Sequence, residues 1–243
     1  RGISQWLDEP VEEMANSEEF NHAIVRAELN GKVWWLDPTN PVVSLEPNAD
    51  IANKYALVLN PAVQGFEALP KLKPENYIYE EEQNYNFLND GDVRADVKAD
   101  YRKMGASSLS HGLLTNPRDK TLFEIVEYFS EGMDLKDFKF KAASPSPDAS
   151  RILRDLHFDF SYWTPSATYR SPVGQFFPLK DVWLSSSFYE TDGRESDLRL
   201  AEIPLIHRTR KILKDVKGIG DPMICELKSP WIDLKRQVRY TKN

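Results

Sequence analysis

The chain has 243 residues, is 41% hydrophobic and 12% aromatic, and carries a formal net charge of −7 at pH 7, which suits two small domains or one large one. This charge argues against a nucleic-acid partner, which normally needs a basic protein face, and no apolar run approaches the ~20 residues of a membrane-spanning helix. The only cysteine, Cys225, excludes an internal disulfide.

A β-hairpin is predicted near the N-terminus, after an acidic segment over residues 1–19. The dipeptide Asn30-Gly31 lies between two alternating runs and is a strong hairpin signal, because both residues of such a turn need positive φ. The turn places His22 and Asp37 on one face as diagonal neighbours, roughly 7–8 Å apart at the backbone. At that spacing a carboxylate can orient an imidazole. A register slipped by one residue would instead bury Asp37 without a partner, at a cost of several kcal/mol.

The two faces of this hairpin differ in composition. One face is apolar, and we expect it to pack on a core; it consists of Ala23, Val25, Ala27, Leu29, Trp34 and Leu36. The other face is mixed and carries the His–Asp pair at its open end; it consists of His22, Ile24, Arg26, Glu28, Val33, Trp35 and Asp37. The pair indicates either a catalytic dyad or an exposed hairpin end at which the two residues meet without chemistry.

The next segments are expected to complete a first domain. Residues 54–59 predict a closing strand, and residues 61–74, with their prolines and lysines, predict a linker. We therefore divide the chain into a first domain, residues 1–60, a linker, residues 61–76, and a β-rich domain, residues 77–243.

The β-rich domain is predicted to open with a long hairpin. Aromatic residues alternate from Tyr77 to Phe87, the turn falls at residues 89–91, and the chain returns from Val93 to Tyr101. Three consecutive glutamates within the first strand are interpreted as a solvated strand face or edge protection rather than as a metal site; they are Glu80, Glu81 and Glu82.

One amphipathic helix and several strands are expected after this hairpin. Asn116 is the predicted N-cap, with Pro117 at the first helical position, and the helix ends near Gly132. Its apolar stripe is Leu122, Ile125, Val126 and Phe129. Strands are predicted from Phe138 and at residues 156–162, 175–179, 183–189, 223–227 and 237–240. The fold class is therefore α+β, mostly β, with a β-sandwich-like layer covered by one helix.

The remaining polar residues suggest no further site. His157 and Asp159 share a strand face, but two ligands without a third favour a surface pair over a metal centre. His111 and His207 have no acidic or cysteine neighbours at ligand spacing, and residues 216–220 are best interpreted as a plain glycine turn. We predict no metal and no cofactor.

The hairpin residues resemble a known superfamily. They are Phe20-Asn21-His22-Ala23-Ile24-Val25, followed by Gly31-Lys32-Val33-Trp34-Trp35-Leu36-Asp37-Pro38-Thr39. These runs resemble the His and Asp strands of the transglutaminase-like superfamily, most closely its bacterial branch with an N-terminal β-domain of unknown function (DUF3857). That superfamily has a papain-like core, with a Cys at a helix start, a His on a strand and an Asp at the end of the next strand.

The resemblance implies a role for individual residues. His22 matches the general base and Asp37 the orienting acid, while Asn21, Trp35 and Thr39 match positions that support the site. The close resemblance covers residues 1–60, and we expect this part to form antiparallel strands that complete a transglutaminase-like core. The β-rich region that follows the core in this branch resembles residues 77–243 more loosely.

The chain departs from the superfamily at the nucleophile, because it has no cysteine before His22. Cys225 lies in a strand-like stretch, where a cysteine is usually a small core residue. Two explanations are open: a C-terminal piece of a longer protein whose Cys-bearing half lies upstream, or a degenerate core. The start at Arg1, without Met or signal peptide, favours the first, and we expect the β-rich domain to be incomplete as well.

Two functions of different classes follow. In the first, the parent protein is a cysteine-dependent acyl transferase, protease or amidase acting on peptide amides, with a peptide or protein substrate; this chain alone is then inactive. In the second, it is a non-catalytic binding or assembly module, in which Tyr162-Trp163 and Phe188-Tyr189 contact a protein or glycan. The resemblance implies an exported bacterial protein, periplasmic or secreted.

Overall fold

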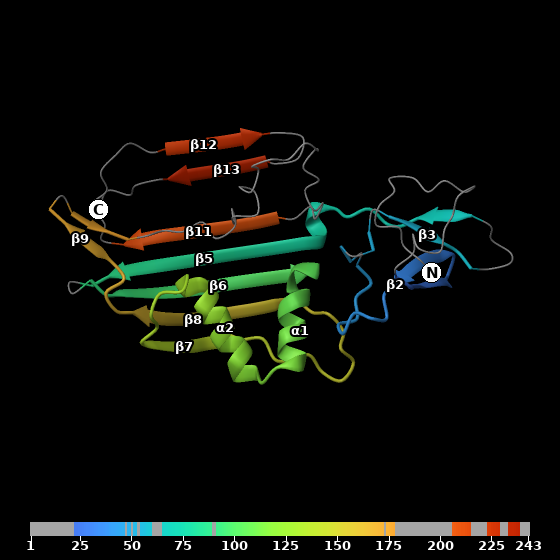
Figure 1. Cartoon of the computed structure of the whole chain (residues 1–243), viewed down its shortest axis with the longest axis horizontal. Helices are drawn as coiled ribbons and strands as arrows, with labels where there is room; N and C mark the ends of the chain where they lie inside the picture. Colours follow the sequence, from blue (N-terminus) through green and yellow to red (C-terminus); the bar gives the residue numbers. More distant parts are fainter. Residues whose placement is uncertain are drawn as a thin grey trace, which may run out of the picture.

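The computed structural model contains a five-stranded sheet with two helices on one face and two small hairpins at one end (Figure 1). It describes residues 22–46, 48–49, 51–52, 54–59, 65–88, 91–172, 174–177, 206–214, 223–228 and 233–238. The described residues are mostly β, and their sheets contain antiparallel and mixed strands. The predicted α+β, mainly β class is therefore confirmed at this level.

The N-terminal hairpin has the predicted register. It consists of β1, Val25–Leu29, and β2, Lys32–Leu36, and it pairs Leu29 with Lys32 and Val25 with Leu36. Asn30 and Gly31 have φ of 54° and 72°, as the tight turn between these strands requires. The local sequence thus fixes which side chains share a face.

The face of this hairpin that packs is not the one predicted. Val25 and Leu29 of the apolar face are 47% and 65% exposed, whereas Ile24 of the mixed face is 5% exposed. A small apolar cluster forms on the mixed face, from Ile24, Ile51, Ala56 and Leu69, with Trp35 packed against it. The prediction was wrong because the packing face is chosen by residues distant in sequence rather than by the number of apolar side chains.

A second hairpin supplies part of that cluster. It pairs β3, Tyr55–Leu57, with β4, Phe66–Ala68, and Ala56 of β3 is fully buried. The predicted closing strand is therefore present. The segment predicted as a linker, however, contains β4 and the short 3-10 helix η3, Pro74–Asn76, so part of it belongs to the folded structure.

The large sheet has the strand order β11-β5-β6-β8-β7. The strands are β5, Tyr77–Phe87; β6, Val93–Lys103; β7, Asp137–Ala143; β8, Leu156–Thr164; and β11, Ile206–Lys214. The central strands pair antiparallel, and β11 pairs parallel to β5. The long hairpin predicted from residue 77 is therefore confirmed, while the parallel edge strand was not predicted.

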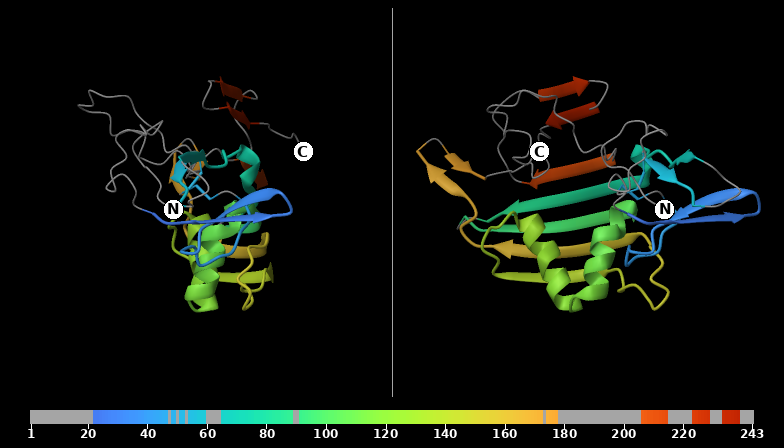
Figure 2. Two further views of the ribbon diagram at one scale, coloured as in Figure 1. Left: turned by 90° about the vertical axis from the view of Figure 1, so that its right-hand side faces the viewer. Right: turned by 45° about the vertical axis from the view of Figure 1, so that its right-hand side comes forward.

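Two helices cover the same face of this sheet (Figure 2). A 3-10 turn, η4, Met104–Ala106, leads into α1, Ser107–Thr115, and α2 follows at Arg118–Ser130. The predicted helix corresponds to α2, but Pro117 is its N-cap rather than its first residue. The sequence did not predict α1.

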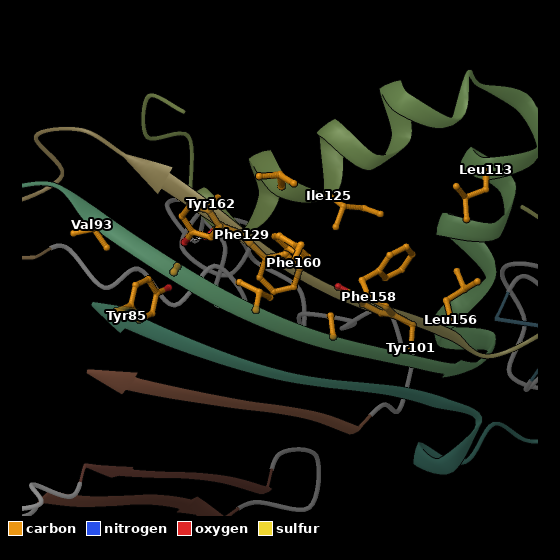
Figure 3. Packing of buried hydrophobic residues seen from close by; sticks show 14 of the residues in the cluster. Tyr85, Val93, Tyr101, Leu113, Ile125, Phe129, Leu156, Phe158, Phe160 and Tyr162 are labelled. Carbon is orange, nitrogen blue, oxygen red and sulfur yellow. Dashed lines mark hydrogen bonds between the residues drawn. The ribbon is translucent and has the colours of Figure 1, made fainter. Parts of the chain in front are cut away.

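The main core lies between these helices and the sheet. Ile125, Val126 and Phe129 of α2 are buried, as their spacing predicts, and Figure 3 shows α2 facing Phe158 and Phe160 of β8. The rings of Phe129 and Phe160 have centroids 5.4 Å apart. The full cluster of buried residues is Tyr85, Val93, Ala95, Val97, Ala99, Tyr101, Ala106, Leu113, Ile125, Val126, Phe129, Leu156, Phe158, Phe160, Tyr162 and Ala167.

The opposite face of the sheet is polar, which distinguishes it from the predicted sandwich. Lys141 Nζ lies 2.8 Å from Asp96 Oδ1, and Arg102 contacts Glu80 at 2.6 Å. Covering such a face with a second sheet would desolvate charges at a high cost. In the described part of the chain, helices on one face and charged side chains on the other replace the second layer.

The N-terminal hairpins are joined to the large sheet by a few polar and apolar contacts. Val43 forms a parallel bridge with Ile152, and the Ala49 N–H donates to the Tyr77 hydroxyl at 3.0 Å. A small cluster also spans the junction and consists of Ala52, Leu72, Tyr77 and Met104. These contacts link the two parts that the sequence divides into domains; the division itself stays a prediction.

Two further hairpins complete the described structure. β9, Tyr169–Ser171, pairs with β10, Gly174–Phe176, and β12, Met223–Lys228, pairs with β13, Asp233–Val238. The strand predicted at 237–240 therefore begins earlier, because its register is set by β12. The predicted strand at 183–189 lies outside the described residues.

Lys103 has a backbone conformation that favours glycine, with φ 52° and ψ −133° at the end of β6. We expect Lys103→Gly to raise the free energy of unfolding by about 1 kcal/mol. Lys98→Gly, at an exposed and extended position of the same strand, is the control and lowers stability by roughly the same amount. Urea denaturation measures both, and equal destabilisation by the two changes would contradict the strain at Lys103.

Candidate active site

The predicted contact between His22 and Asp37 is present. His22 Nε2 lies 3.0 Å from Asp37 Oδ2, across the open end of the β1–β2 hairpin. The side chain of Asp37 is 7% exposed and that of His22 is 29% exposed. The imidazole is therefore accessible at the molecular surface while its carboxylate partner is shielded.

Thr39 holds the Asp37 carboxylate in place. Its backbone N–H and its hydroxyl both donate to Asp37 Oδ1, at 3.0 Å and 2.7 Å. An aspartate that accepts a hydrogen bond from the backbone two residues later is a common local turn. The sequence Asp37-Pro38-Thr39 thus fixes one carboxylate oxygen locally and leaves Oδ2 directed at His22.

The hydrogen bonds at this site favour the ionised form of Asp37. Burial by itself would raise the pKa of its carboxyl group, but the hydrogen bonds from Thr39 and His22 together outweigh burial and lower the pKa. An ionised carboxylate only accepts hydrogen bonds. It follows that the ring nitrogen facing it, His22 Nε2, carries a proton.

This arrangement leaves Nδ1 as the basic nitrogen of His22. A neutral imidazole has one protonated and one unprotonated nitrogen, and Asp37 holds the proton on Nε2. Nδ1 then has a free lone pair that accepts a proton from an incoming group. A nucleophile served by this histidine must therefore approach Nδ1.

The neighbouring residues of the same hairpin face support the dyad indirectly. Trp35 packs against the apolar cluster of Ile24, and the Arg26 guanidinium lies 6.0 Å from the Trp35 ring. Arg26 Nε also donates to Glu67 of β4 at 3.0 Å. Trp35 therefore anchors the hairpin rather than joining the hydrogen bonds, and Asn21 lies outside the described residues.

Cys225 does not lie near the dyad. It belongs to β12, whose described partner is β13, and Figure 1 shows this ribbon well separated from the β1–β2 hairpin. The prediction that Cys225 is not the nucleophile agrees with this placement. A cysteine acting with His22 therefore has to come from elsewhere.

Two other histidines have acidic partners in the structure. His157 Nδ1 lies 2.9 Å from Asp100 on the exposed sheet face. His207 Nε2 lies 3.5 Å from Glu81, a residue far from it in sequence and therefore outside the ligand spacings considered for this histidine. No local signal announces this contact, because it depends on the pairing of β11 with β5.

No metal centre is evident in the described part of the chain, where no three His, Cys, Asp or Glu residues gather as a metal site would require. Asp159, which shares a strand with His157, lies 3.9 Å from Lys141 instead. Among the same residues, neither helix is long and apolar enough to span a membrane.

Comparisons of the chain with family models, with curated proteins and with solved structures give no match. The function therefore has to be inferred from the residues of the hairpin motif and from the geometry of the His22–Asp37 pair.

The hydroxyl of Thr39 is expected to control the ionisation of Asp37. Thr39→Ala removes one of the two donors to Oδ1 and should raise the pKa of Asp37, whereas Thr39→Ser keeps the hydroxyl and should leave the pKa nearly unchanged. Carboxyl chemical shifts followed through a pH titration measure the effect. An equal pKa in the Ala and Ser variants would show that the hydroxyl does not stabilise the carboxylate.

Asp37 should also make stability depend on pH. Since folding lowers its pKa, its contribution is complete above the ordinary aspartate value of about 4 and disappears as the pH falls through the lower folded-state value. We expect Asp37→Asn to cost about 1–3 kcal/mol at pH 7 and progressively less in acid. Asp100→Asn, which alters the exposed His157 pair, is the control and should change stability by less than about 1 kcal/mol. A pH-independent loss in Asp37→Asn would contradict the assignment.

Proposed function

We propose that His22 and Asp37 are the general base and the orienting acid of a Cys-His-Asp site that transfers acyl groups from peptide amides in a transglutaminase-like protein. The observation that carries the proposal is the 3.0 Å contact from Nε2 to the shielded carboxylate, which leaves Nδ1 available as a base. The hairpin motif that resembles the superfamily supports the same roles for the same residues.

The proton steps follow from this geometry. His22 Nδ1 accepts the proton of the cysteine thiol, and the thiolate attacks the amide carbonyl carbon. The resulting imidazolium donates its proton to the departing amine as the carbon–nitrogen bond breaks, which leaves a thioester. Asp37 keeps Nε2 protonated throughout and stabilises the positive charge on the ring.

The second half of the reaction determines the product. Water attacking the thioester releases a carboxylic acid, which is the reaction of a protease or amidase, whereas an amine forms a new amide and cross-links two chains. In both cases His22 Nδ1 removes a proton from the attacking group and returns one to the cysteine sulfur. The dyad serves either acceptor equally.

The chain places no cysteine nucleophile next to His22 and Asp37, because its only cysteine is Cys225 in β12. The proposal requires a cysteine from sequence that precedes His22 in a longer protein, positioned so that its sulfur reaches Nδ1. On the same resemblance we propose that this parent protein is exported by a bacterium to the periplasm or beyond.

A non-catalytic module is the second candidate, and the position of Cys225 away from the dyad favours it. The aromatic residues suggested for partner binding support it less. Tyr162 is 2% exposed and donates a hydrogen bond to the Phe129 carbonyl, so it is a core residue. Phe188 and Tyr189 lie outside the described residues.

The two candidates are separated by measuring amide cleavage and ammonia release in the intact protein encoded by the complete reading frame. We expect His22→Ala to lower turnover by at least about a thousandfold without unfolding the protein. His157→Ala, which removes the exposed His–Asp pair of the sheet, is the matched control and should retain full activity.

The thiol provides an independent measurement. If His22 activates a cysteine, alkylation of that cysteine by iodoacetamide should be fast near neutral pH and should slow in His22→Ala. Unchanged turnover in His22→Ala would reject the dyad, and an intact wild-type protein without any reactive thiol would establish the non-catalytic module.

A further inference from the structure

We propose that a basic, extended segment of a partner protein binds by pairing with the edge of the acidic strand β5. In the structure β11 pairs with this edge, and we propose that the partner segment can replace it. The proposal is independent of the dyad. It rests on the charges of the two strands and on how β11 is attached to the sheet.

The two strands carry opposite charges. β11 has the sequence Ile-His-Arg-Thr-Arg-Lys-Ile-Leu-Lys and contains no carboxylate, whereas β5 contains three consecutive glutamates, residues 80–82, and no basic residue. On the outer face Arg208 lies 2.5 Å from Glu80, and Arg210 lies 3.4 Å from Glu82. The glutamates that the sequence suggested as edge protection are therefore the contacts that receive β11.

The helix-covered face of the sheet adds two further contacts between a basic and an acidic side chain. His207 Nε2 lies 3.5 Å from Glu81 Oε2, and Lys211 Nζ lies 2.9 Å from Glu131 Oε1 at the end of α2. The two carboxylates are only 4% and 6% exposed. Because successive side chains of a strand point to opposite faces, β11 is held by opposite charges on both sides of the sheet.

β11 contributes little to the apolar core. None of its eight residues with described burial is buried, and the main core cluster contains no residue from it. At the other edge, β7 packs Phe140 and Ala143 against that cluster. β11 is thus attached by backbone pairing, by ion pairs and by an edge contact between the rings of His207 and Tyr79, whereas β7 is also attached by apolar side chains that pack on the main core.

The contacts that hold β11 on β5 also define which partner segment could take the place of β11. Backbone groups of β5 pair with any extended segment, and the glutamates select for cations. The register of β11 shows the pattern required: a segment parallel to β5, with two basic residues spaced as Arg208 and Arg210 for the outer face. Two basic residues that are two positions apart point to the same side of a strand, so both reach the glutamates of the outer face.

Hydrogen exchange on the full chain tests whether β11 separates from the sheet. We expect amides of residues 206–214 to exchange before those of β6, and we expect their exchange to accelerate roughly three- to tenfold between low and high salt, because the outer ion pairs are screened. Exchange of β11 together with β6, at a rate that does not depend on salt, would overturn the proposal.

A peptide with the sequence of residues 206–214 tests whether the edge accepts a strand from outside. The host is the full chain carrying Arg208→Glu and Arg210→Glu, which repels its own β11; Lys139→Glu with Lys141→Glu on β7 is the matched control. We expect the peptide to bind the host in a salt-sensitive manner and to bind the control at least tenfold more weakly. A peptide with both arginines replaced by glutamate should not bind the host.

Three outcomes would overturn the proposal: a folded host that does not bind the peptide, equal binding of the two peptides, or a host that keeps wild-type protection over residues 206–214. Sedimentation of the wild-type chain over a range of concentrations tests the alternative that β11 of a second copy of the chain pairs with β5. A dimer in which protection of residues 206–214 rises with concentration would assign the edge to β11 of a second copy and would reject the partner segment. If the host fails to fold, exchange in the wild-type chain still decides whether β11 separates.

Discussion

The candidate site depends on the register of one hairpin. Asn30 and Gly31, both at positive φ, allow the chain to reverse in two residues, and every pair of neighbours along β1 and β2 follows from that turn. His22 and Asp37 meet only in this register. A slip by one residue would remove Ile24 from its apolar cluster and separate the imidazole from the carboxylate, so packing and site geometry favour the same pairing.

Features encoded locally were predicted well. The Asn-Gly turn needs no information from the rest of the chain, and the alternation along β6 and β8 reproduces which side chains are buried. In β5 the period of two is also present, but Glu81, which was expected on a solvated face, is buried against the helix-covered side. The stripe of α2 likewise matches the core, because a helix that covers a sheet buries residues at spacings of three and four. Even the contact between His22 and Asp37 follows from a turn of two residues.

Features that depend on distant residues were not predicted. The hairpin packs through its mixed face because Ile51 and Leu69 lie there, and no pattern within the hairpin indicates this. The helix α1 has only nine residues, and its N-cap, Ala106, makes no side-chain capping hydrogen bond, so no local start signal marks it. The pairing of β11 with β5, and with it the contact between His207 and Glu81, joins segments far apart in the chain.

The same parallel pairing has a consequence for how the protein folds. Arg208 and Glu80 are 128 positions apart, whereas β5, β6 and α2 are close neighbours in sequence. Closing so long a loop costs more chain entropy than forming a hairpin, so the local elements assemble early and β11 joins late. During synthesis the glutamate-bearing side of β5 therefore remains open until the ribosome has released the segment around residue 214, and that interval is when an unintended strand has its best opportunity to pair there.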